Sequence, residues 1–218
     1  MIYLKATGRL GNQLFQYAFV KYLQKHTGQN IAITFDRVRS FSKSKDDGWD
    51  NSLNDFLISD YKEIYYSQKK YIPLWIKLKI TRKFIELLQK YKLYNGHGEL
   101  FGIIYCYNPQ EQKFELKKNK NYIVDGLFEY DYIVNDIFEQ IVGKLTNKEL
   151  LTETGKNFLN KIENQKTICL SVRKFDLEDL KFKDYYQVCG RKYYYKALDY
   201  ILQASPNAKI VVFSDAVQ

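Results

Sequence analysis

The chain has 218 residues, of which 45% are hydrophobic and 17% aromatic, and its formal net charge is +9. This composition excludes wholesale disorder and allows one large domain or two small ones, and no apolar run reaches the roughly 18–20 residues that a membrane span needs. The excess of Lys and Arg favours a solubilising surface, and the alternatives are anionic partners: a nucleotide, a nucleic acid or a membrane surface.

The first 36 residues are predicted to form a βαβ unit. Alternating apolar and polar residues indicate a strand over 2–6, a glycine turn spans 7–11, and a helix is expected from Asn12, as its N-cap, to about Thr27. Gly28 stands where a helix end favours a left-handed residue, and a second strand covers 30–36. The glycine turn therefore lies at the carboxyl end of a parallel strand, which is where α/β folds bind ligands.

A basic amphipathic helix is predicted over 73–94, after a polar loop at 37–60. Its apolar positions recur at helical spacing: Ile76, Ile80, Phe84, Leu87 and Leu88. We favour an ordinary two-faced helix, and docking on a membrane surface is the alternative.

Further strands are predicted at 101–107 and 122–126, and helices at 131–143 and 146–164. The second of these helices opens with a capping-box pattern at Thr146 and Glu149. A second βαβ unit then follows, with buried strands at 167–173 and 209–213 and a helix at 191–203. Because α/β character restarts near Gln165, we expect a domain boundary there.

The turn G-R-L-G-N-Q is the first candidate site. It matches neither the dinucleotide fingerprint nor the phosphate-binding P-loop. Gly8 and Gly11 allow backbone N–H groups to approach a ligand, Arg9 offers a forked cationic donor, and Asn12 and Gln13 suit sugar hydroxyls. These groups favour a sugar or a sugar phosphate, and a purely structural β–α turn is an equal alternative.

Two further candidate sites follow predicted strands near the end of the chain. Arg173 ends the first strand and Lys174 follows it. An arginine there can grip a phosphate with two hydrogen bonds, although a solvated loop also accounts for the charges. Ser214 can bond a phosphate oxygen, and Asp215 can bind a ribose or cap a helix, which is the more frequent use.

Neither a metal site nor a disulfide framework is expected. The three cysteines form no C-x-x-C pair, and His26 and His97 are isolated. The N-terminus lacks the basic segment of a signal peptide, so the sequence predicts a cytoplasmic protein.

Five segments together resemble glycosyltransferase family 11, the α-1,2-fucosyltransferases. The stretch G-R-L-G-N-Q-L-F-Q-Y-A at 8–18 resembles the N-terminal signature of the family, and V-D-G-L-F-E-Y-D-Y-I at 124–133 is similar to its central glycine–aromatic motif. S-V-R-K-F-D at 171–176 resembles the donor motif H-x-R-R-G-D-Y. The segments 192–201 and 212–215 look like the helix and the strand end that follow it, and all five occur in the order of the family.

The resemblance implies an α/β fold of GT-B type, with Rossmann-type βαβ units in two halves and the second half incomplete. Residues 1–164 would be an N-terminal α/β domain with a helical insert on the acceptor side, and 165–218 the start of the donor domain. Such an enzyme inverts configuration, needs no metal and transfers L-fucose from GDP-fucose to a sugar hydroxyl, commonly O2 of galactose. Arg173 would hold the GDP diphosphate, and Asp176, Ser214 and Asp215 fall in the same donor motifs.

The resemblance also implies a bacterial enzyme that works on lipid-linked surface glycans at the inner face of the membrane, with no nucleic acid as partner. Ser171, Lys174 and Phe175 depart from the donor motif, and family members usually continue beyond the last strand, so a shortened donor domain is expected. The alternatives are a degenerate homologue that binds a glycan or nucleotide without catalysis and, third, a basic nucleic-acid-binding protein. The catalytic base is not identified, and the carboxylates considered for it are Asp36, Asp125, Glu129 and Asp176.

Overall fold

The computed structural model describes residues 1–43, 49–91, 99–106, 114–146, 149, 151–172 and 189–214. These residues belong to two compact units, Met1–Leu150 and Leu151–Gln218. Both units are α/β, and most of their strands are parallel, as the two βαβ patterns predict. The assignment of 1–164 to an acceptor domain and of 165–218 to a donor domain stays a prediction.

The first unit is built on a six-stranded sheet with the order β3-β2-β1-β6-β5-β4. In chain order its strands are β1 (Ile2–Lys5), β2 (Ile31–Thr34), β3 (Lys62–Glu63), β4 (Glu99–Leu100), β5 (Ile103–Cys106) and β6 (Tyr122–Gly126). Neighbouring strands are parallel, except that β4 runs antiparallel to β5. The carboxyl ends of β2, β1, β6 and β5 therefore meet at one edge of the sheet.

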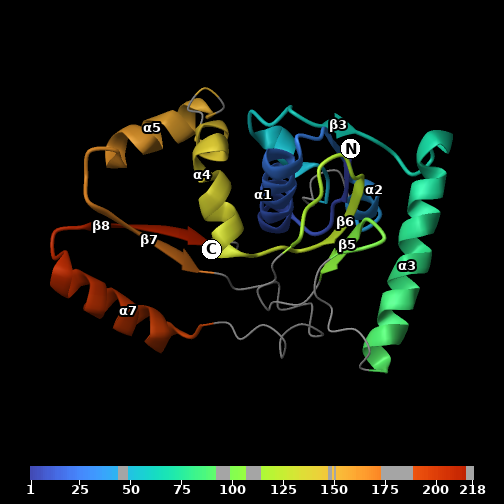
Figure 1. Ribbon diagram of the computed structural model, residues 1–218. Helices are drawn as coiled ribbons and strands as arrows, with labels where there is room; N and C mark the ends of the chain where they lie inside the picture. The colour runs from blue at the N-terminus through green and yellow to red at the C-terminus, as the bar shows by residue number, and fades with distance from the viewer. Residues whose placement is uncertain are drawn as a thin grey trace. The chain divides into compact units, whose positions relative to one another are not determined.

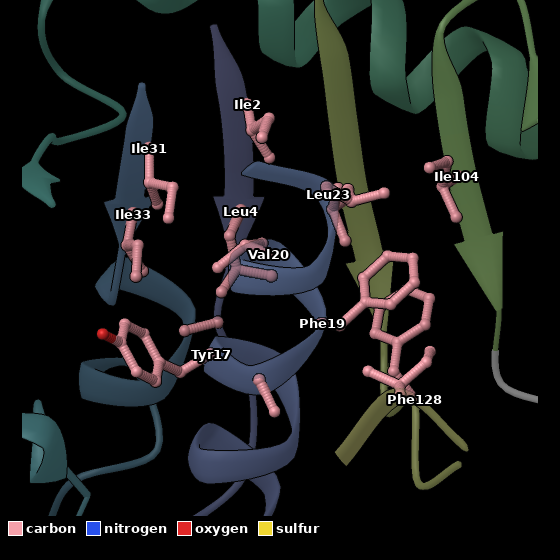
Figure 2. Packing of buried hydrophobic residues seen from close by; sticks show 14 of the residues in the cluster. Ile2, Leu4, Tyr17, Phe19, Val20, Leu23, Ile31, Ile33, Ile104 and Phe128 are labelled. Atoms are coloured by element: carbon pink, nitrogen blue, oxygen red, sulfur yellow. The ribbon is translucent and has the colours of Figure 1, made fainter. Parts of the chain in front are cut away.

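Helices cover both faces of this sheet (Figure 1). They are α1 (Leu10–Thr27), α2 (Asp36–Arg39), α3 (Ile72–Lys90) and α4 (Asp131–Leu145), with short 3-10 helices at Ser52–Asp55 and Lys69–Tyr71. On one face, α1 and α4 pack in the main core, where the rings of Phe19 and Phe128 stack with centroids 3.9 Å apart (Figure 2). On the other face, Leu78 of α3 packs on Ile103 and Ile123.

The helix after the N-terminal turn begins earlier than predicted. Helix α1 begins at Leu10, Arg9 occupies the N-cap position, and the N–H of Gln13 donates to the Arg9 carbonyl over 3.1 Å. The prediction that Asn12 caps this helix is wrong, because backbone hydrogen bonding begins three residues earlier and places Asn12 in the first turn. The predicted left-handed Gly28 is confirmed, with φ of 69° at the end of α1.

The face of α3 that packs on the sheet is not the one that its sequence indicates. Leu78, Thr81 and Ile85 are buried, whereas the apolar positions used to predict the helix are exposed or half-buried. The predicted helix is confirmed, but Ile76, Ile80, Phe84 and Leu87 lie on its exposed side and do not pack on the core. The helix has a second apolar face, and that second face fits the sheet.

The second unit contains α5 (Glu153–Ile162), β7 (Thr167–Val172), α7 (Arg191–Ala204) and β8 (Lys209–Ser214), with β7 and β8 parallel. The predicted capping box at Thr146 is wrong, because Thr146 follows the last turn of α4 and its N–H donates to the Val142 carbonyl. Thr152 caps α5 instead, and its hydroxyl accepts from the N–H of Gly155 over 3.2 Å.

The two strands of the second unit are also more exposed than predicted. No residue of β7 is buried, and Val211 is the one buried residue of β8. Within the described part of this unit the sheet has two strands, so each strand is an edge strand and most of its side chains keep contact with solvent.

Candidate binding site at the carboxyl end of the sheet

A row of polar side chains lies at the carboxyl ends of four neighbouring strands. Side chains alternate between the faces of a sheet, and Leu4, Val124 and Ile104 point into the core beneath α1. The residues that follow them therefore share the α3 face. In sheet order this polar row is Thr34 of β2, Lys5 of β1, Asp125 of β6 and Tyr105 of β5.

An ion pair forms the centre of this polar row. The ammonium of Lys5 lies 2.7 Å from a carboxylate oxygen of Asp125, and the guanidinium of Arg37 lies 3.8 Å from the other oxygen. Asp125 is 0% exposed, whereas the side chain of Lys5 is 14% exposed. A charged pair at this depth is costly to break, so Asp125 holds the Lys5 ammonium at a defined place.

A pocket of about 430 Å³ opens between this row and α3, and we call it the α3 pocket. Its size lies within the range of about 300–1,000 Å³ that is typical of small-molecule sites. Its lining consists of Lys5, Tyr66, Trp75, Leu78, Lys79, Arg82, Lys83 and Glu86. The pocket thus combines aromatic rings with an excess of cations at the carboxyl end of a parallel sheet.

Two aromatic side chains in the lining carry buried polar atoms that no described group satisfies. The rings of Tyr66 and Trp75 meet edge to face, with centroids 5.1 Å apart. The Tyr66 hydroxyl and the Trp75 indole N–H are buried and have no hydrogen-bond partner within the described residues. Burial, together with the negative charges of Asp125 and Asp36, raises the pKa of Tyr66, so its hydroxyl is a neutral donor at physiological pH.

Unpaired buried donors of this kind call for an explanation, because nearly all such groups in folded proteins are hydrogen-bonded. A ligand with hydroxyl groups would satisfy both donors and lay its apolar face on the indole ring. At the same wall, Arg82 donates to Glu86 over 2.8 Å, and its guanidinium lies 5.6 Å from the ring centroid of Tyr105. The α3 pocket is therefore suited to a sugar, or to a sugar that carries an anionic group.

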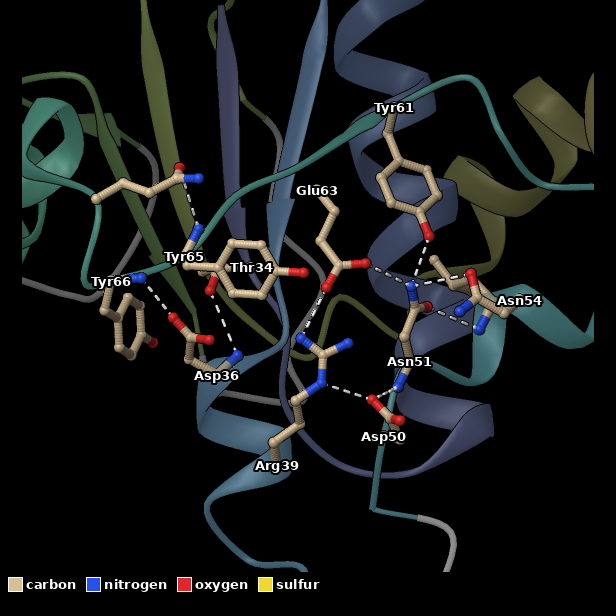
Figure 3. Close-up of polar contacts among 12 residues, drawn as sticks. Thr34, Asp36, Arg39, Asp50, Asn51, Asn54, Tyr61, Glu63, Tyr65 and Tyr66 are labelled. Atoms are coloured by element: carbon tan, nitrogen blue, oxygen red, sulfur yellow. Dashed lines mark hydrogen bonds and ion pairs between the residues drawn. The ribbon is translucent and has the colours of Figure 1, made fainter. Parts of the chain in front are cut away.

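The segment that carries Tyr66 is fixed by a polar network beside β2 and β3 (Figure 3). The N–H of Tyr66 donates to the carboxylate of Asp36, the first residue of α2. Arg39 of the same helix bridges Asp50 and Glu63, with 2.7 Å to each carboxylate. The network therefore joins α2, the segment at Asp50 and the end of β3, and it positions the aromatic wall of the pocket.

The glycine turn after β1 is held by two buried amides. Gln13 donates to the carbonyls of Gly8 (3.0 Å) and Asp50 (2.8 Å), and it accepts from the N–H of Ser52 over 2.9 Å. Gln16 donates to the Thr7 carbonyl and accepts from the Thr7 N–H. The motif G-R-L-G-N-Q-L-F-Q thus contains the groups that give the turn its shape.

Other parts of this turn face solvent. Arg9 is exposed, and its guanidinium lies 5.1 Å from the ring centroid of Trp49. Gly11 is exposed, and a methyl group at its Cα would contact nothing within 4 Å, whereas the side chain of Asn12 packs against Gly8. The ligand-binding role of the five predicted residues of the turn stays a prediction.

The predicted donor-site residues stay predictions as well. Arg173, Asp176 and Asp215 lie outside the described residues, and Ser214 ends β8 in the second unit. Among the carboxylates considered as a base, Asp125 is buried against Lys5, Asp36 bonds the backbone of Tyr66, and Glu129 is exposed. Asp176 again lies outside the described part.

Sequence reasoning missed most of the α3 pocket. Lys5, Tyr66, Trp75 and Arg82 were not singled out, although Asp125 was considered. A usable signal did exist for Lys5 and Asp125. Each is the fourth residue of a predicted five-residue strand, so the alternation of side chains places both on one face once the two strands pair in parallel.

Comparison with known proteins decides the family. The family model described as glycosyl transferase family 11 matches residues 1–218. The chain belongs to this family. It is therefore a glycosyltransferase, and the resemblance drawn from the five motifs is confirmed.

One curated relative is the O-antigen biosynthesis glycosyltransferase WbnK of Escherichia coli. It is 27% identical over 231 residues, an alignment that covers 100% of this chain and 73% of the relative. No solved structure matches the chain. In the described part, no helix is long and apolar enough to cross a membrane, and no group of three or more His, Cys, Asp or Glu side chains is arranged to hold a metal ion.

Proposed function

We propose that this glycosyltransferase transfers L-fucose from GDP-fucose to O2 of a galactoside, with inversion at fucose C1 and without a metal ion. The observation that carries the proposal is the match of the family model to residues 1–218, since the family implies fucosyltransferase-type transfer. The five motifs, in the family's order, support the same donor and acceptor. The name of the relative supports a bacterial surface glycan as the source of the acceptor.

The α3 pocket is our candidate for the acceptor site. The Trp75 ring and the unpaired donors of Trp75 and Tyr66 suit the face and the hydroxyls of a galactoside. Lys5 lines the same pocket from the carboxyl end of β1 and is held there by Asp125. In this proposal Asp125 is a positioning residue, because it holds the Lys5 ammonium in place.

The donor site is assigned to the predicted GT-B-type donor half. There Arg173 would grip the diphosphate of GDP-fucose, with Asp176, Ser214 and Asp215 as further donor-binding residues of that half. The turn at 8–13, in the first unit, would present backbone and polar groups to a sugar. The acceptor oxygen forms a bond to fucose C1 while the bond from C1 to the diphosphate oxygen breaks. GDP leaves with that electron pair, and the acceptor hydroxyl gives its proton to a carboxylate base or to water. Cations at the diphosphate lower the barrier because negative charge develops on the leaving group.

The test is GDP release from GDP-fucose by the 218-residue chain, with and without a soluble galactoside, compared across three proteins. We expect acceptor-dependent release from the wild type. Trp75→Ala should raise the KM for the acceptor about tenfold, which corresponds to the loss of roughly 1.4 kcal/mol of binding. Phe138→Ala is the matched control, because Phe138 is an exposed aromatic residue of α4 on the other face of the sheet.

A different outcome would decide between the alternatives. GDP binding by titration calorimetry without release from GDP-fucose would indicate a homologue that binds without catalysis. Release from another nucleotide sugar, with GDP-fucose inert, would overturn the donor assignment. An unchanged KM in Trp75→Ala would remove the α3 pocket from the acceptor site while leaving the family and the reaction class intact.

A further inference from the structure

The long helix α3 carries an apolar face that its packing on the sheet leaves exposed. Its exposed residues are Ile72, Ile76, Ile80, Phe84, Leu87 and, one residue beyond the helix, Tyr91. Successive members are three or four residues apart, so at about 100° per residue they form one continuous stripe. Ile80, in its middle, is 64% exposed. We call this set the outer stripe.

The outer stripe lies opposite the face that is already buried. Leu78 packs on the sheet and Ile85 is buried, and the 100° spacing places both on the side of the helix away from Ile80. The stripe therefore contributes nothing to the core of the first unit. An apolar patch of this length on a protein surface marks an interaction site more often than an accident of composition.

Lysines border the outer stripe on both sides. Lys79, Lys83 and Lys90 lie along one edge and Lys77 along the other, and all four are exposed. Within the described residues no carboxylate forms an ion pair with any of the four. The single carboxylate of α3, Glu86, is paired with Arg82 instead. The helix thus presents a net positive surface around an apolar centre.

We propose that the outer stripe and its four lysines dock this protein on an anionic lipid bilayer surface. Large aliphatic and aromatic side chains can enter the boundary between headgroups and acyl chains, while lysines at the edges reach the anionic headgroups. Each lysine near such a surface adds about 1 kcal/mol of attraction. The exposed apolar face, which a purely solvated helix does not need, is accounted for in this way.

The charge pattern argues against a second copy of the chain as the occupant. A two-fold contact through the outer stripe would bring the lysine borders of both copies to the rim of one interface, where like charges repel. An anionic surface turns the same lysines into attractive contacts. Charge complementarity therefore selects the lipid surface.

Docking through α3 also has a consequence for the α3 pocket. Lys79 and Lys83 lie at the edge of the outer stripe and line the pocket at the same time. A docked helix brings the pocket mouth close to the headgroups, where a glycan attached to a lipid carrier would be in reach. This consequence rests on the proposed function, whereas docking itself does not.

Co-sedimentation with lipid vesicles tests the proposal. The full 218-residue chain is incubated with phosphatidylcholine vesicles and with vesicles that contain roughly 30% phosphatidylglycerol. Ile80→Asp/Phe84→Asp places two carboxylates in the stripe. Phe138→Asp/Phe158→Asp is the matched control, since it adds the same charge at exposed aromatic positions on α4 and α5.

We expect the wild type to partition onto the anionic vesicles at least tenfold more strongly than onto the neutral ones, and less strongly at high salt. The stripe variant should lose at least tenfold in partitioning, and the control should stay within about twofold of the wild type. Equal binding by wild type and stripe variant, equal loss in both variants, or no binding to anionic vesicles would overturn the proposal.

Two further measurements keep the result interpretable. Circular dichroism establishes that both variants are folded, and size-exclusion chromatography without lipid tests for self-association. A wild-type dimer that the stripe variant converts to a monomer would identify the stripe as a self-interface and overturn the proposal. GDP release with a soluble galactoside should be equal in wild type and stripe variant, because Ile80 and Phe84 do not line the α3 pocket. Failure of the proposed function is thereby distinguished from failure of docking.

Discussion

Replacing Lys5 by Met tests whether the charge at the centre of the polar row holds the first unit together. The change keeps most of the side-chain volume but removes the ammonium that lies 2.7 Å from the Asp125 carboxylate. Asp125, at 0% exposure, would then be a buried charge with its nearest partner gone. Removing one partner of a buried ion pair costs about 3–5 kcal/mol.

The structure places the expected cost at the low end of that range. The guanidinium of Arg37 stays 3.8 Å from the second oxygen of Asp125 and continues to offset its charge. We therefore expect Lys5→Met to lower the free energy of unfolding by about 3 kcal/mol. Asp125→Asn keeps an acceptor for Lys5 and should cost about 1.5 kcal/mol. The double variant should cost about 2.5 kcal/mol, which corresponds to a coupling energy of about 2 kcal/mol.

Urea unfolding followed by tryptophan fluorescence is the appropriate assay. Trp49 and Trp75 are the two tryptophans of the chain, and both lie in the first unit, so the signal reports on that unit alone. A chain with two units can unfold in more than one step, so a signal from one unit is needed for a two-state analysis. A coupling energy below about 0.5 kcal/mol would refute the reasoning, since it would mean that water replaces Lys5 at little cost.

Three other predictions concern the turn, the acid response and the second unit. Gly8 has φ of 76° and its Cβ would come within 2.8 Å of the Asn12 Cβ, so Gly8→Ala should cost about 2 kcal/mol in urea unfolding, whereas Gly11→Ala, in open space, should be neutral or slightly stabilising. Burial alone would raise the pKa of Asp60, but hydrogen bonds from two donors on α1 and one on α4 outweigh it and lower the pKa. The folded pKa therefore lies below the unfolded one, so Asp60 stabilises the fold at neutral pH and loses this effect as the pH falls below about 4. Asp60→Asn should cost about 2 kcal/mol at pH 7 and clearly less at pH 3, and equal costs at both pH values would contradict the assignment. Thr152→Ala removes the cap of α5 and should cost the second unit about 1 kcal/mol, measured by circular dichroism because that unit has no tryptophan.

Local features of the chain were predictable because they depend on neighbours in sequence. The alternation in 2–6, the helical spacing after the turn and the left-handed Gly28 predict β1, α1 and the C-terminus of α1, and the structure has all three. The five motifs together indicated the family without any tertiary information, and the family model confirms it. The prediction of the N-cap of α1 was wrong. The N-cap is the residue just before the first helical residue, and the structure has Arg9 there because α1 begins at Leu10.

Contacts between distant residues needed the tertiary structure. Lys5 and Asp125 are 120 residues apart in sequence and become neighbours only because β1 and β6 pair in parallel with a defined register. Tyr66 lines the same pocket as Lys5, and its backbone is held there by a hydrogen bond to Asp36. A site of this kind has no local signature, since each of its residues is ordinary within its own segment.

The sequence by itself determined that this chain is an α/β glycosyltransferase of family 11 and where its first helix ends, because hydrophobic periodicity, a glycine and a contiguous motif are local properties. Only the tertiary structure decided which face of α3 is buried. Periodicity shows that a helix has apolar faces, but the sheet beneath it selects the face that fits, here that of Leu78 and Ile85. The same selection leaves Ile80 and Phe84 exposed.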